Sequence, residues 1–246
     1  MSPPRILAIG GSDPSGGAGI QADIKTITML GGYAMAAITA VTVQNTLGVR
    51  ATNPLPAALV LEQINACLDD IGADAVKIGM LGSGETALAV AERLERFDGP
   101  VVFDPVMVAT SGGVLADKQV VAAFEALIAR ATLTTPNLPE LAALGGEAAL
   151  LARARALLIK GGHGEGAKVV DRLLTPTGER LFSAPRIETR HTHGTGCTLA
   201  SAIATGLGAG LGLEQAVEQG IAYVRAALMA APGFGGGHGP LGHMLG

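Results

Sequence analysis

The chain has 246 residues and a formal net charge of -4, with 48% hydrophobic and 15% charged residues. This size fits one large α/β domain or two small ones. The acidic balance and the lack of a basic stripe argue against nucleic-acid binding, and no apolar run approaches the ~20 residues needed to span a bilayer. Cys67 and Cys197 are far apart, which argues against a disulfide framework or a zinc site. Since no signal-peptide pattern precedes the first strand, we expect a cytoplasmic protein.

The first predicted element is a buried strand over residues 6–10, followed by a glycine-rich loop and a helix. The loop covers residues 10–19, and apolar residues then recur with helical spacing at positions 20, 24 and 27. Strand, glycine loop and helix in this order begin a parallel α/β fold. The loop has no Gly-Lys-Ser/Thr ending and no dinucleotide-binding fingerprint. We therefore expect it to hold a substrate at the strand ends, where such sheets bind ligands.

The rest of the chain alternates between strand patterns and helix patterns. Further strands are predicted at residues 34–44, 74–80, 100–105, 132–137 and 157–162. Helices are predicted at residues 56–68, 85–96, 115–128, 141–156 and 213–229. A hairpin with a Pro/Gly turn is expected over residues 169–182, and the glycine-rich tail is expected to be loosely ordered. Because no linker or repeat divides the chain, we predict a single domain over residues 1–246 with a mostly parallel sheet between helical layers.

A second glycine-rich segment, residues 191–206, turns from polar residues into an apolar helical run. A helix that begins near Gly196 would leave backbone N–H groups unpaired and add the positive end of its dipole. Because glycines let a ligand approach that backbone, the segment predicts an anion site, most naturally for a phosphate. Cys197 lies in the first turn, where the pKa of a thiol is expected to fall toward neutrality. The alternative is an ordinary glycine turn with Cys197 as a small buried residue.

Polar side chains gather at the predicted strand ends, which form the ligand-binding edge of such a sheet. They are Asp13, Gln44, Asp104, Asn137, Glu140 and Lys160. Asp104 and Glu140 offer oxygen ligands suited to Mg²⁺, and Lys160 can contact a phosphate as a point charge. Phosphoryl transfer requires a metal ion, a positively charged side chain, backbone N–H groups that bind the phosphate, and a base. Taken singly, Asp104 could be a turn acid, Glu140 a first-turn helix acid and Lys160 a solvated lysine.

A series of segments gives the chain a resemblance to a known family. They cover residues 10–23, 40–46, 77–80, 104–107, 135–140, 160–163 and 193–198. In this order, and over nearly the whole chain, they resemble the hydroxymethylpyrimidine/phosphomethylpyrimidine kinases of thiamine biosynthesis, within the ribokinase-like superfamily. The resemblance implies a ribokinase-like three-layer α/β/α sandwich. It also implies ATP-dependent phosphorylation of 4-amino-5-hydroxymethyl-2-methylpyrimidine, and of its monophosphate to the diphosphate, with Mg²⁺ as cofactor and a homodimer as the assembly.

The resemblance further implies roles for individual residues. Gln44 would bind the pyrimidine, because an amide offers one donor and one acceptor to an aminopyrimidine edge; a polar strand cap is the alternative. Asp23 and the Gly11 backbone would assist Gln44. Met80 and Val106 would line the faces of the ring, although Met80 could also be core filler. The other expected roles are catalysis by Cys197, Gly194, Gly196 and Lys160, contact with ATP or phosphate by Lys160, Thr195 and Asn137, and Mg²⁺ binding by Asp104 and Glu140.

The sequence departs from the family pattern at two places. Cys197 stands where most ribokinase-like kinases have Asp, although Cys is common in this subfamily. The segment over residues 141–160 is shorter than usual for the family, with about one helix expected in place of a helix-loop-helix.

Two other functions are alternatives to this prediction. One is a pyridoxal or pyridoxine kinase on the same fold; Gln44 and the glycines of residues 16–19 favour the pyrimidine. The other is a non-catalytic pyrimidine-binding sensor, against which the joint presence of Asp104, Glu140, Lys160 and Cys197 argues.

Overall fold

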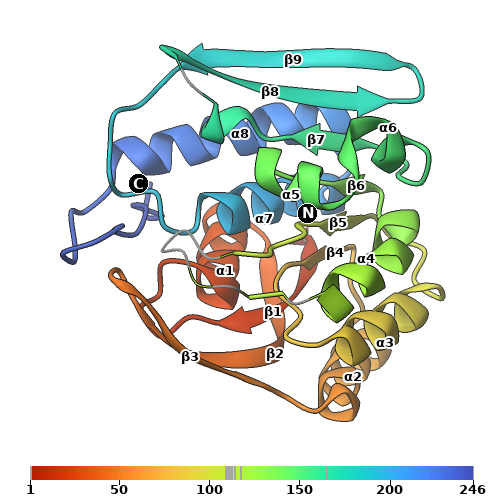
Figure 1. Ribbon diagram of the computed structural model, residues 1–246. Helices are drawn as coiled ribbons and strands as arrows, with labels where there is room; N and C mark the ends of the chain where they lie inside the picture. The colour runs from red at the N-terminus through yellow and green to blue at the C-terminus, as the bar shows by residue number, and fades with distance from the viewer. Residues whose placement is uncertain (1, 109–112, 114, 117, 165, 246) are drawn as a thin grey trace.

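In the computed structural model, strands from residues 5–185 join one mixed sheet (Figure 1). The structure describes residues 2–108, 113, 115–116, 118–164 and 166–245. Within them the sheet has nine strands in the order β3-β2-β1-β4-β5-β6-β7-β8-β9. The pairings from β2 through β1, β4, β5 and β6 to β7 are parallel, whereas β3 at one edge and β8 and β9 at the other pair antiparallel. The predicted mostly parallel sheet is confirmed.

The strands and helices have the following bounds. The strands are β1 Arg5–Ser12, β2 Tyr33–Asn45, β3 Gly48–Pro54, β4 Ala75–Ile78, β5 Val101–Phe103, β6 Leu133–Thr134, β7 Leu157–Ile159, β8 Lys168–Thr175 and β9 Gly178–Pro185. The α-helices are α1 Gly19–Met29, α2 Ala57–Ala66, α3 Gly84–Leu94, α4 Lys118–Arg130, α5 Leu138–Ala143, α6 Gly146–Leu151, α7 Thr195–Gly208 and α8 Leu213–Met229. A short π-helix, Cys67–Ile71, continues α2, and a 3-10 turn, Gly161–His163, follows β7.

Helices cover both faces of the sheet, as the three-layer prediction requires. On one face, apolar side chains of α2, α3 and α4 such as Val60, Val90 and Phe124 pack against the strands. On the other face, α1, α7 and α8 contribute a second core that includes Leu199 and Val217. Helix α7 is buried almost throughout because it lies between the sheet and α8. Its apolar character therefore reflects contact on both sides, and it places the helix start at the edge of the sheet.

The predicted elements are present, with three differences. Residues 48–54 form the edge strand β3, which the sequence analysis missed because the segment is polar and exposed. The single helix expected over residues 141–156 is wrong: α5 and α6 are separated at Gly145 and Gly146, whose φ values of +94° and +85° end the first helix. The helix predicted over residues 115–128 is present as α4, although residue 117 lies outside the described residues.

The third difference concerns the C-terminal tail, which was expected to be loosely ordered. The His238 N–H donates to the Thr46 carbonyl at 2.9 Å, and the Gly239 carbonyl accepts from the His193 N–H at 3.1 Å. Farther on, the His243 imidazole is 2.9 Å from the Thr198 hydroxyl and is buried. The tail thus connects the end of β2 with the start of α7, two segments that lie far apart in the sequence.

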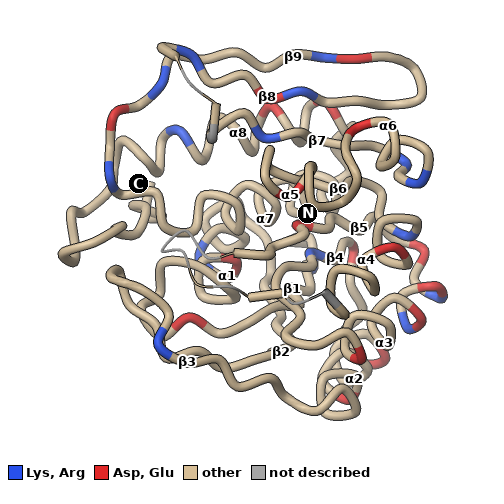
Figure 2. The backbone as a smooth tube through the Cα atoms, in the orientation of Figure 1, with Lys and Arg blue, Asp and Glu red and all other residues tan. Residues whose placement is uncertain are grey.

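No described helix is long and apolar enough to cross a membrane. Acidic and basic residues are interspersed along the described chain rather than gathered into a basic stripe (Figure 2).

Candidate active site

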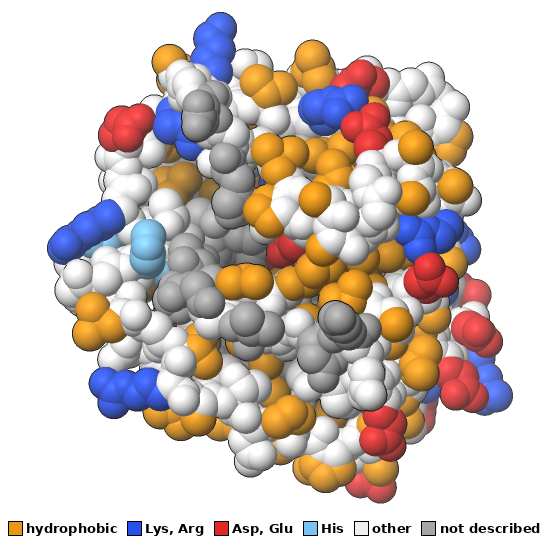
Figure 3. All heavy atoms as spheres, viewed as in Figure 1, with side chains coloured by type: hydrophobic (Ala, Val, Ile, Leu, Met, Phe, Trp, Pro, Cys, Tyr) orange, Lys and Arg blue, Asp and Glu red, His pale blue; other side chains and the backbone are white. Residues whose placement is uncertain are grey.

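The carboxyl ends of the parallel strands open into a cavity of about 870 Å³. This volume is within the usual range for small-molecule sites. The space-filling view shows a hollow on this face with an acidic side chain visible inside it (Figure 3). All of the predicted site residues except Asp23 line the cavity: Gly11, Gln44, Met80, Asp104, Val106, Asn137, Glu140, Lys160, Gly194, Thr195, Gly196 and Cys197. The topology therefore brings together groups from seven separate segments, as the strand-end argument predicted.

The predicted anion site, residues 194–197 and called the anion loop below, is a sharp turn that leads directly into α7. Gly194 caps the helix with a φ of +90°, and a Cβ there would lie 1.9 Å from the Gly17 carbonyl oxygen, so this position requires glycine. A Cβ on Gly196 would lie 3.1 Å from Asp104 Oδ2 and 3.5 Å from Lys160 Nζ. The backbone at the start of the helix thus closely approaches the charged groups. The N–H groups and the positive dipole end of a helix start suit a phosphate bound between the loop and Lys160.

A charged cluster lies opposite the anion loop. Lys160 follows β7, and its Nζ is 2.6 Å from Asp104 Oδ1 and 3.7 Å from Glu140 Oε2. Burial opposes the charge of Lys160, but the nearby carboxylates more than offset it and raise the pKa above its ordinary value. Thr135 donates a hydrogen bond to Asp104 at 3.1 Å. A permanently charged lysine at the cavity wall is suited to bind the phosphates of a nucleotide.

Glu140 and Asn137 also have a structural role. They form a capping box at the start of α5: the Glu140 N–H donates to Asn137 Oδ1 and the Asn137 N–H donates to Glu140 Oε2, both at 2.8 Å. The helix-acid alternative for Glu140 is therefore present, while its carboxylate still lines the cavity beside Lys160. Among the described residues, no group of three or more His, Cys, Asp or Glu side chains forms a metal cluster. Two carboxylates beside Lys160 on the cavity wall nevertheless fit Mg²⁺, which commonly binds through one or two carboxylates plus substrate phosphates.

Asp23 does not reach the cavity wall, so the expected contact with the substrate is corrected. Its carboxylate is fully buried and accepts hydrogen bonds from Lys77 Nζ at 2.8 and 2.9 Å and from Ser201 Oγ at 2.8 Å. Ser201 lies one turn after Cys197 on α7, hence on the same side of that helix. Asp23 therefore holds Lys77 and the first turns of α7 in place rather than touching the ligand.

The comparisons with known proteins agree with this geometry. The family model for phosphomethylpyrimidine kinase matches residues 13–242. The hydroxymethylpyrimidine/phosphomethylpyrimidine kinase of Streptomyces coelicolor is 45% identical, over 99% of this chain and 95% of the relative. This chain belongs to the phosphomethylpyrimidine kinase family.

Two solved kinase structures align with this chain over nearly its whole length. The phosphomethylpyrimidine kinase of Clostridium difficile aligns with a TM-score of 0.80 and 36% identity, over 91% of this chain and 98% of that one. Pyridoxal kinase of Staphylococcus aureus in complex with AMP-PCP and pyridoxal aligns with a TM-score of 0.90 and 30% identity, over 99% of this chain and 94% of that one. The predicted ribokinase-like fold is confirmed.

The pKa of Cys197 differs from the value expected from the sequence. Burial raises the pKa of the thiol to about 11, although Lys77 and the Gly19 backbone N–H act in the opposite direction. The carboxylates of Asp23 and Asp104 add to the effect of burial. The expected fall of the pKa toward neutrality is therefore wrong, because desolvation and nearby negative charge outweigh the effects of Lys77 and the Gly19 N–H.

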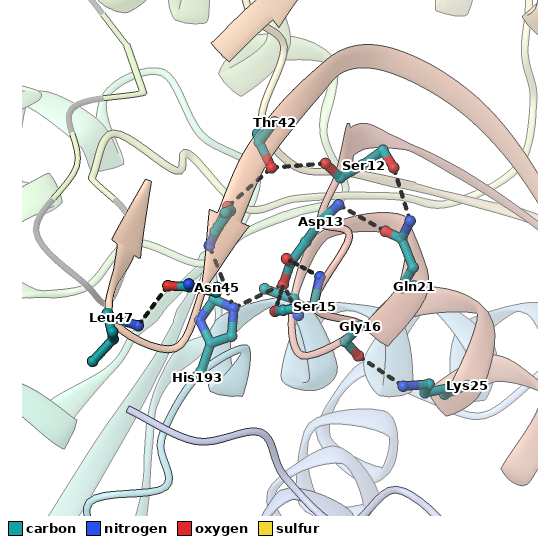
Figure 4. A network of polar contacts seen from close by, with 12 residues as sticks. Ser12, Asp13, Ser15, Gly16, Gln21, Lys25, Thr42, Asn45, Leu47 and His193 are labelled. Carbon is teal, nitrogen blue, oxygen red and sulfur yellow. Dashed lines mark hydrogen bonds and ion pairs between the residues drawn. The ribbon is translucent and has the colours of Figure 1, made fainter. Parts of the chain in front are cut away.

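Two further polar residues of the site were missed by the sequence analysis. Lys77 lines the cavity, yet its side chain is only 1% exposed, and ion pairing with Asp23 raises its pKa despite the opposing effect of burial. His193 is 2% exposed and contacts Asp13 (Figure 4). Both residues occur inside the segments that carry the family resemblance. A lysine in the middle of an apolar strand was the signal that could have revealed the first of them.

Proposed function

We propose that this chain transfers the γ-phosphoryl group of ATP to the hydroxyl of 4-amino-5-hydroxymethyl-2-methylpyrimidine, and then a second phosphoryl group to the monophosphate. The observation that carries this proposal is the convergence of Gln44, the anion loop and the Lys160 cluster on one cavity in a member of this kinase family. The product of both steps is the pyrimidine diphosphate used in thiamine biosynthesis.

In the first step, Gln44 binds the aminopyrimidine edge and orients the hydroxymethyl oxygen toward the start of α7. The thiolate form of Cys197 accepts the hydroxyl proton while the oxygen bonds to the γ-phosphorus, and the bond from that phosphorus to the ADP oxygen breaks. The N–H groups of residues 194–197 and the Lys160 ammonium stabilise the negative charge on the transferring group. Asp104 and Glu140 would hold Mg²⁺, which, when bound, neutralises charge on the nucleotide phosphates.

The second step makes a different demand on the protein. Its nucleophile is a phosphate oxygen, and a phosphate monoester is already ionised near neutral pH because its second pKa is about 6. The second transfer therefore needs no protein base. The anion loop and Lys160 have the same function in both steps, whereas Cys197 has a chemical role only in the first.

Pyridoxal kinase activity is the related alternative, since the S. aureus neighbour binds pyridoxal. A competition experiment compares the two substrates in one vessel: labelled ATP, the hydroxymethylpyrimidine and pyridoxal, with both phosphorylated products quantified. We expect a higher kcat/KM for the pyrimidine. Preference for pyridoxal would reassign the substrate, and absence of ATP turnover with either ring would favour a non-catalytic sensor.

We also propose a Mg²⁺ requirement, a homodimeric assembly and a cytoplasmic location. The Mg²⁺ requirement rests on the two carboxylates beside Lys160 and is tested by chelation and readdition of the metal. The homodimer is tested by light scattering coupled to size-exclusion chromatography. A cytoplasmic location follows from the proposed use of ATP as phosphoryl donor and is tested by cell fractionation.

A further inference from the structure

The amide of Gln44 contacts one polar group on each side. On one side, Thr42 Oγ1 is 3.2 Å from Gln44 Oε1 and 3.0 Å from the Ser12 carbonyl oxygen. On the other side, Gln44 Nε2 is 3.3 Å from His193 Nε2. The oxygen and nitrogen of a glutamine amide are nearly equal in shape, so their assignment depends on which neighbours are donors and which are acceptors.

The His193 contact shows which way the amide must point. His193 Nε2 lies 2.8 Å from Asp13 Oδ2. Asp13 is a carboxylate that also accepts hydrogen bonds from the Ser15 and Ala18 N–H groups and from the Ser15 hydroxyl, all at 2.9 Å. Burial alone would raise the pKa of Asp13, but the bonds from His193 and Ser15 outweigh it and keep the pKa below its usual range. His193 Nε2 therefore carries a proton, whatever the state of the other ring nitrogen.

A protonated His193 Nε2 cannot accept from the Gln44 amide nitrogen, because both atoms are donors. The Thr42 hydroxyl has a matching conflict, since its single hydrogen faces two acceptors, the Ser12 carbonyl and Gln44 Oε1. Rotation of the Gln44 amide by 180° removes the donor–donor contact with His193 and frees the Thr42 hydrogen for one acceptor. The His193 Nε2–H is then shared: Asp13 Oδ2 accepts it at 2.8 Å and Gln44 Oε1 accepts it as the longer branch at 3.3 Å, while Gln44 Nε2 donates to Thr42 Oγ1, which donates to Ser12.

His193 is rigidly held, so it can impose this orientation. Its backbone N–H donates to the Gly239 carbonyl at 3.1 Å, and its ring packs so closely on Gly17 that a Cβ there would lie 2.5 Å from His193 Cδ2. The side chain is 3% exposed. The Asp13–His193 pair and the ordered tail therefore present a fixed hydrogen-bond donor to Gln44.

We propose that His193, held by Asp13, is a specificity-determining positioning residue that locks the Gln44 amide with its oxygen toward the anion loop and its nitrogen toward Thr42. The proposal rests on the proposed function, in which Gln44 binds the aminopyrimidine. One amide N–H and one oxygen lone pair remain free for the ligand. In this orientation of the amide, called the locked order, the free N–H faces a ring nitrogen of the ligand on the Thr42 side. The free lone pair of the oxygen faces an exocyclic amine on the His193 side.

The locked order also accounts for the placement of the reactive group. In the hydroxymethylpyrimidine the ring nitrogen, the amine-bearing carbon and the hydroxymethyl-bearing carbon follow one another around the ring. An amine on the His193 side therefore puts the hydroxymethyl group on that side too. His193 directly precedes Gly194 and the anion loop, so the order that satisfies the hydrogen bonds is the order that directs the hydroxyl toward the phosphoryl group.

The test uses a ligand with the opposite hydrogen-bond pattern. The 4-oxo counterpart of the substrate carries N–H where the 4-amino compound has a bare ring nitrogen, and a carbonyl where it has the amine. The ratio of kcat/KM for the amino and oxo compounds is measured by competition in one vessel, so the amount of correctly folded enzyme cancels. We expect the wild type to favour the amino compound by about 10- to 100-fold, as for a good bidentate pair.

His193→Leu removes the donor, whereas His193→Gln keeps an N–H at that position. We expect His193→Leu to lower the selectivity ratio about tenfold or more, and His193→Gln to retain most of it. In a Gln44→Ala background, His193→Leu should leave the ratio unchanged, because His193 acts through Gln44. A His193→Leu ratio equal to wild type, or an equal fall in the Gln44→Ala background, overturns the inference alone. A wild-type chain that phosphorylates neither ring overturns the proposed function and the inference with it.

Discussion

The acidity of Cys197 leads to a measurable pH dependence of the first phosphorylation. With a thiol pKa of about 11, only about one molecule in ten thousand carries the thiolate at pH 7, because each pH unit below the pKa lowers that fraction tenfold. If Cys197 is the base, kcat/KM for the hydroxymethylpyrimidine should rise about 100-fold between pH 7 and pH 9. The thiolate form gains population as pH rises, so the slope is positive.

The monophosphate provides an internal control in the same enzyme. Its nucleophile is already ionised, so the rate of the second phosphorylation should be nearly constant between pH 7 and pH 9. Cys197→Asp should give a flat profile for the first step, since a carboxylate at its reference pKa of about 3.9 is ionised throughout this range. Cys197→Ser should lose about 10²–10⁴-fold in the first step at pH 9, the usual contribution of a general base, and much less at pH 7.

The assay follows ADP release with saturating ATP and metal in buffers of constant ionic strength. Alkylation by iodoacetamide in a Cys67→Ser background gives the thiol pKa independently, because Cys67 is the one other cysteine in the chain. The alkylation rate should rise about tenfold per pH unit, and bound pyrimidine plus ATP should slow it. A wild-type first step that is independent of pH, or a Cys197→Ser variant with the wild-type profile, would refute the assignment of Cys197 as base.

Three other substitutions test the remaining groups of the site. Gln44→Ala should weaken pyrimidine binding by roughly 1–3 kcal/mol in calorimetry, the loss of a bidentate pair, and leave ATP binding nearly unchanged; equal loss of both would indicate a folding defect. Glu140→Gln keeps the capping box, which accepts Gln, but removes a charge, so stability should hold while the Mg²⁺ requirement rises; a wild-type Mg²⁺ titration would leave Glu140 with the capping role alone. Lys77→Met should lower the free energy of unfolding by about 3–5 kcal/mol, since it leaves the buried Asp23 carboxylate unpaired, and Asp23→Asn in the same chain should recover part of that loss in denaturant titrations.

Most of the fold could be predicted from the sequence because local pattern and final environment agree. The apolar strands are central and buried on both faces, and the last helix occupies the predicted residues. The failures have physical causes: β3 is an exposed edge strand with little apolar patterning. The break between α5 and α6 depends on two consecutive glycines with positive φ within a segment of otherwise helical character.

The site was predictable where function follows strand-end position and unpredictable where it depends on tertiary contacts. Lys160 and Asp104 come together because parallel strands end at one edge. The pairing of Asp23 with Lys77 joins α1 to β4, and nothing in the local sequence of either element indicates that the carboxylate turns away from the cavity. The pKa of Cys197 depends on burial and on carboxylates distant in sequence, whereas the sequence shows only the helix start. Likewise, the contact of His193 with Asp13 spans most of the chain.

The central claim is that this cavity carries out two successive phosphoryl transfers to one pyrimidine. Mass spectrometry of the products from purified protein, 4-amino-5-hydroxymethyl-2-methylpyrimidine and Mg-ATP tests it most directly. We predict that a species with one added phosphate appears first and is converted into a species with two, with ADP formed in step with each. Recovery of the unmodified pyrimidine under conditions in which the protein is folded and binds ATP would contradict the account.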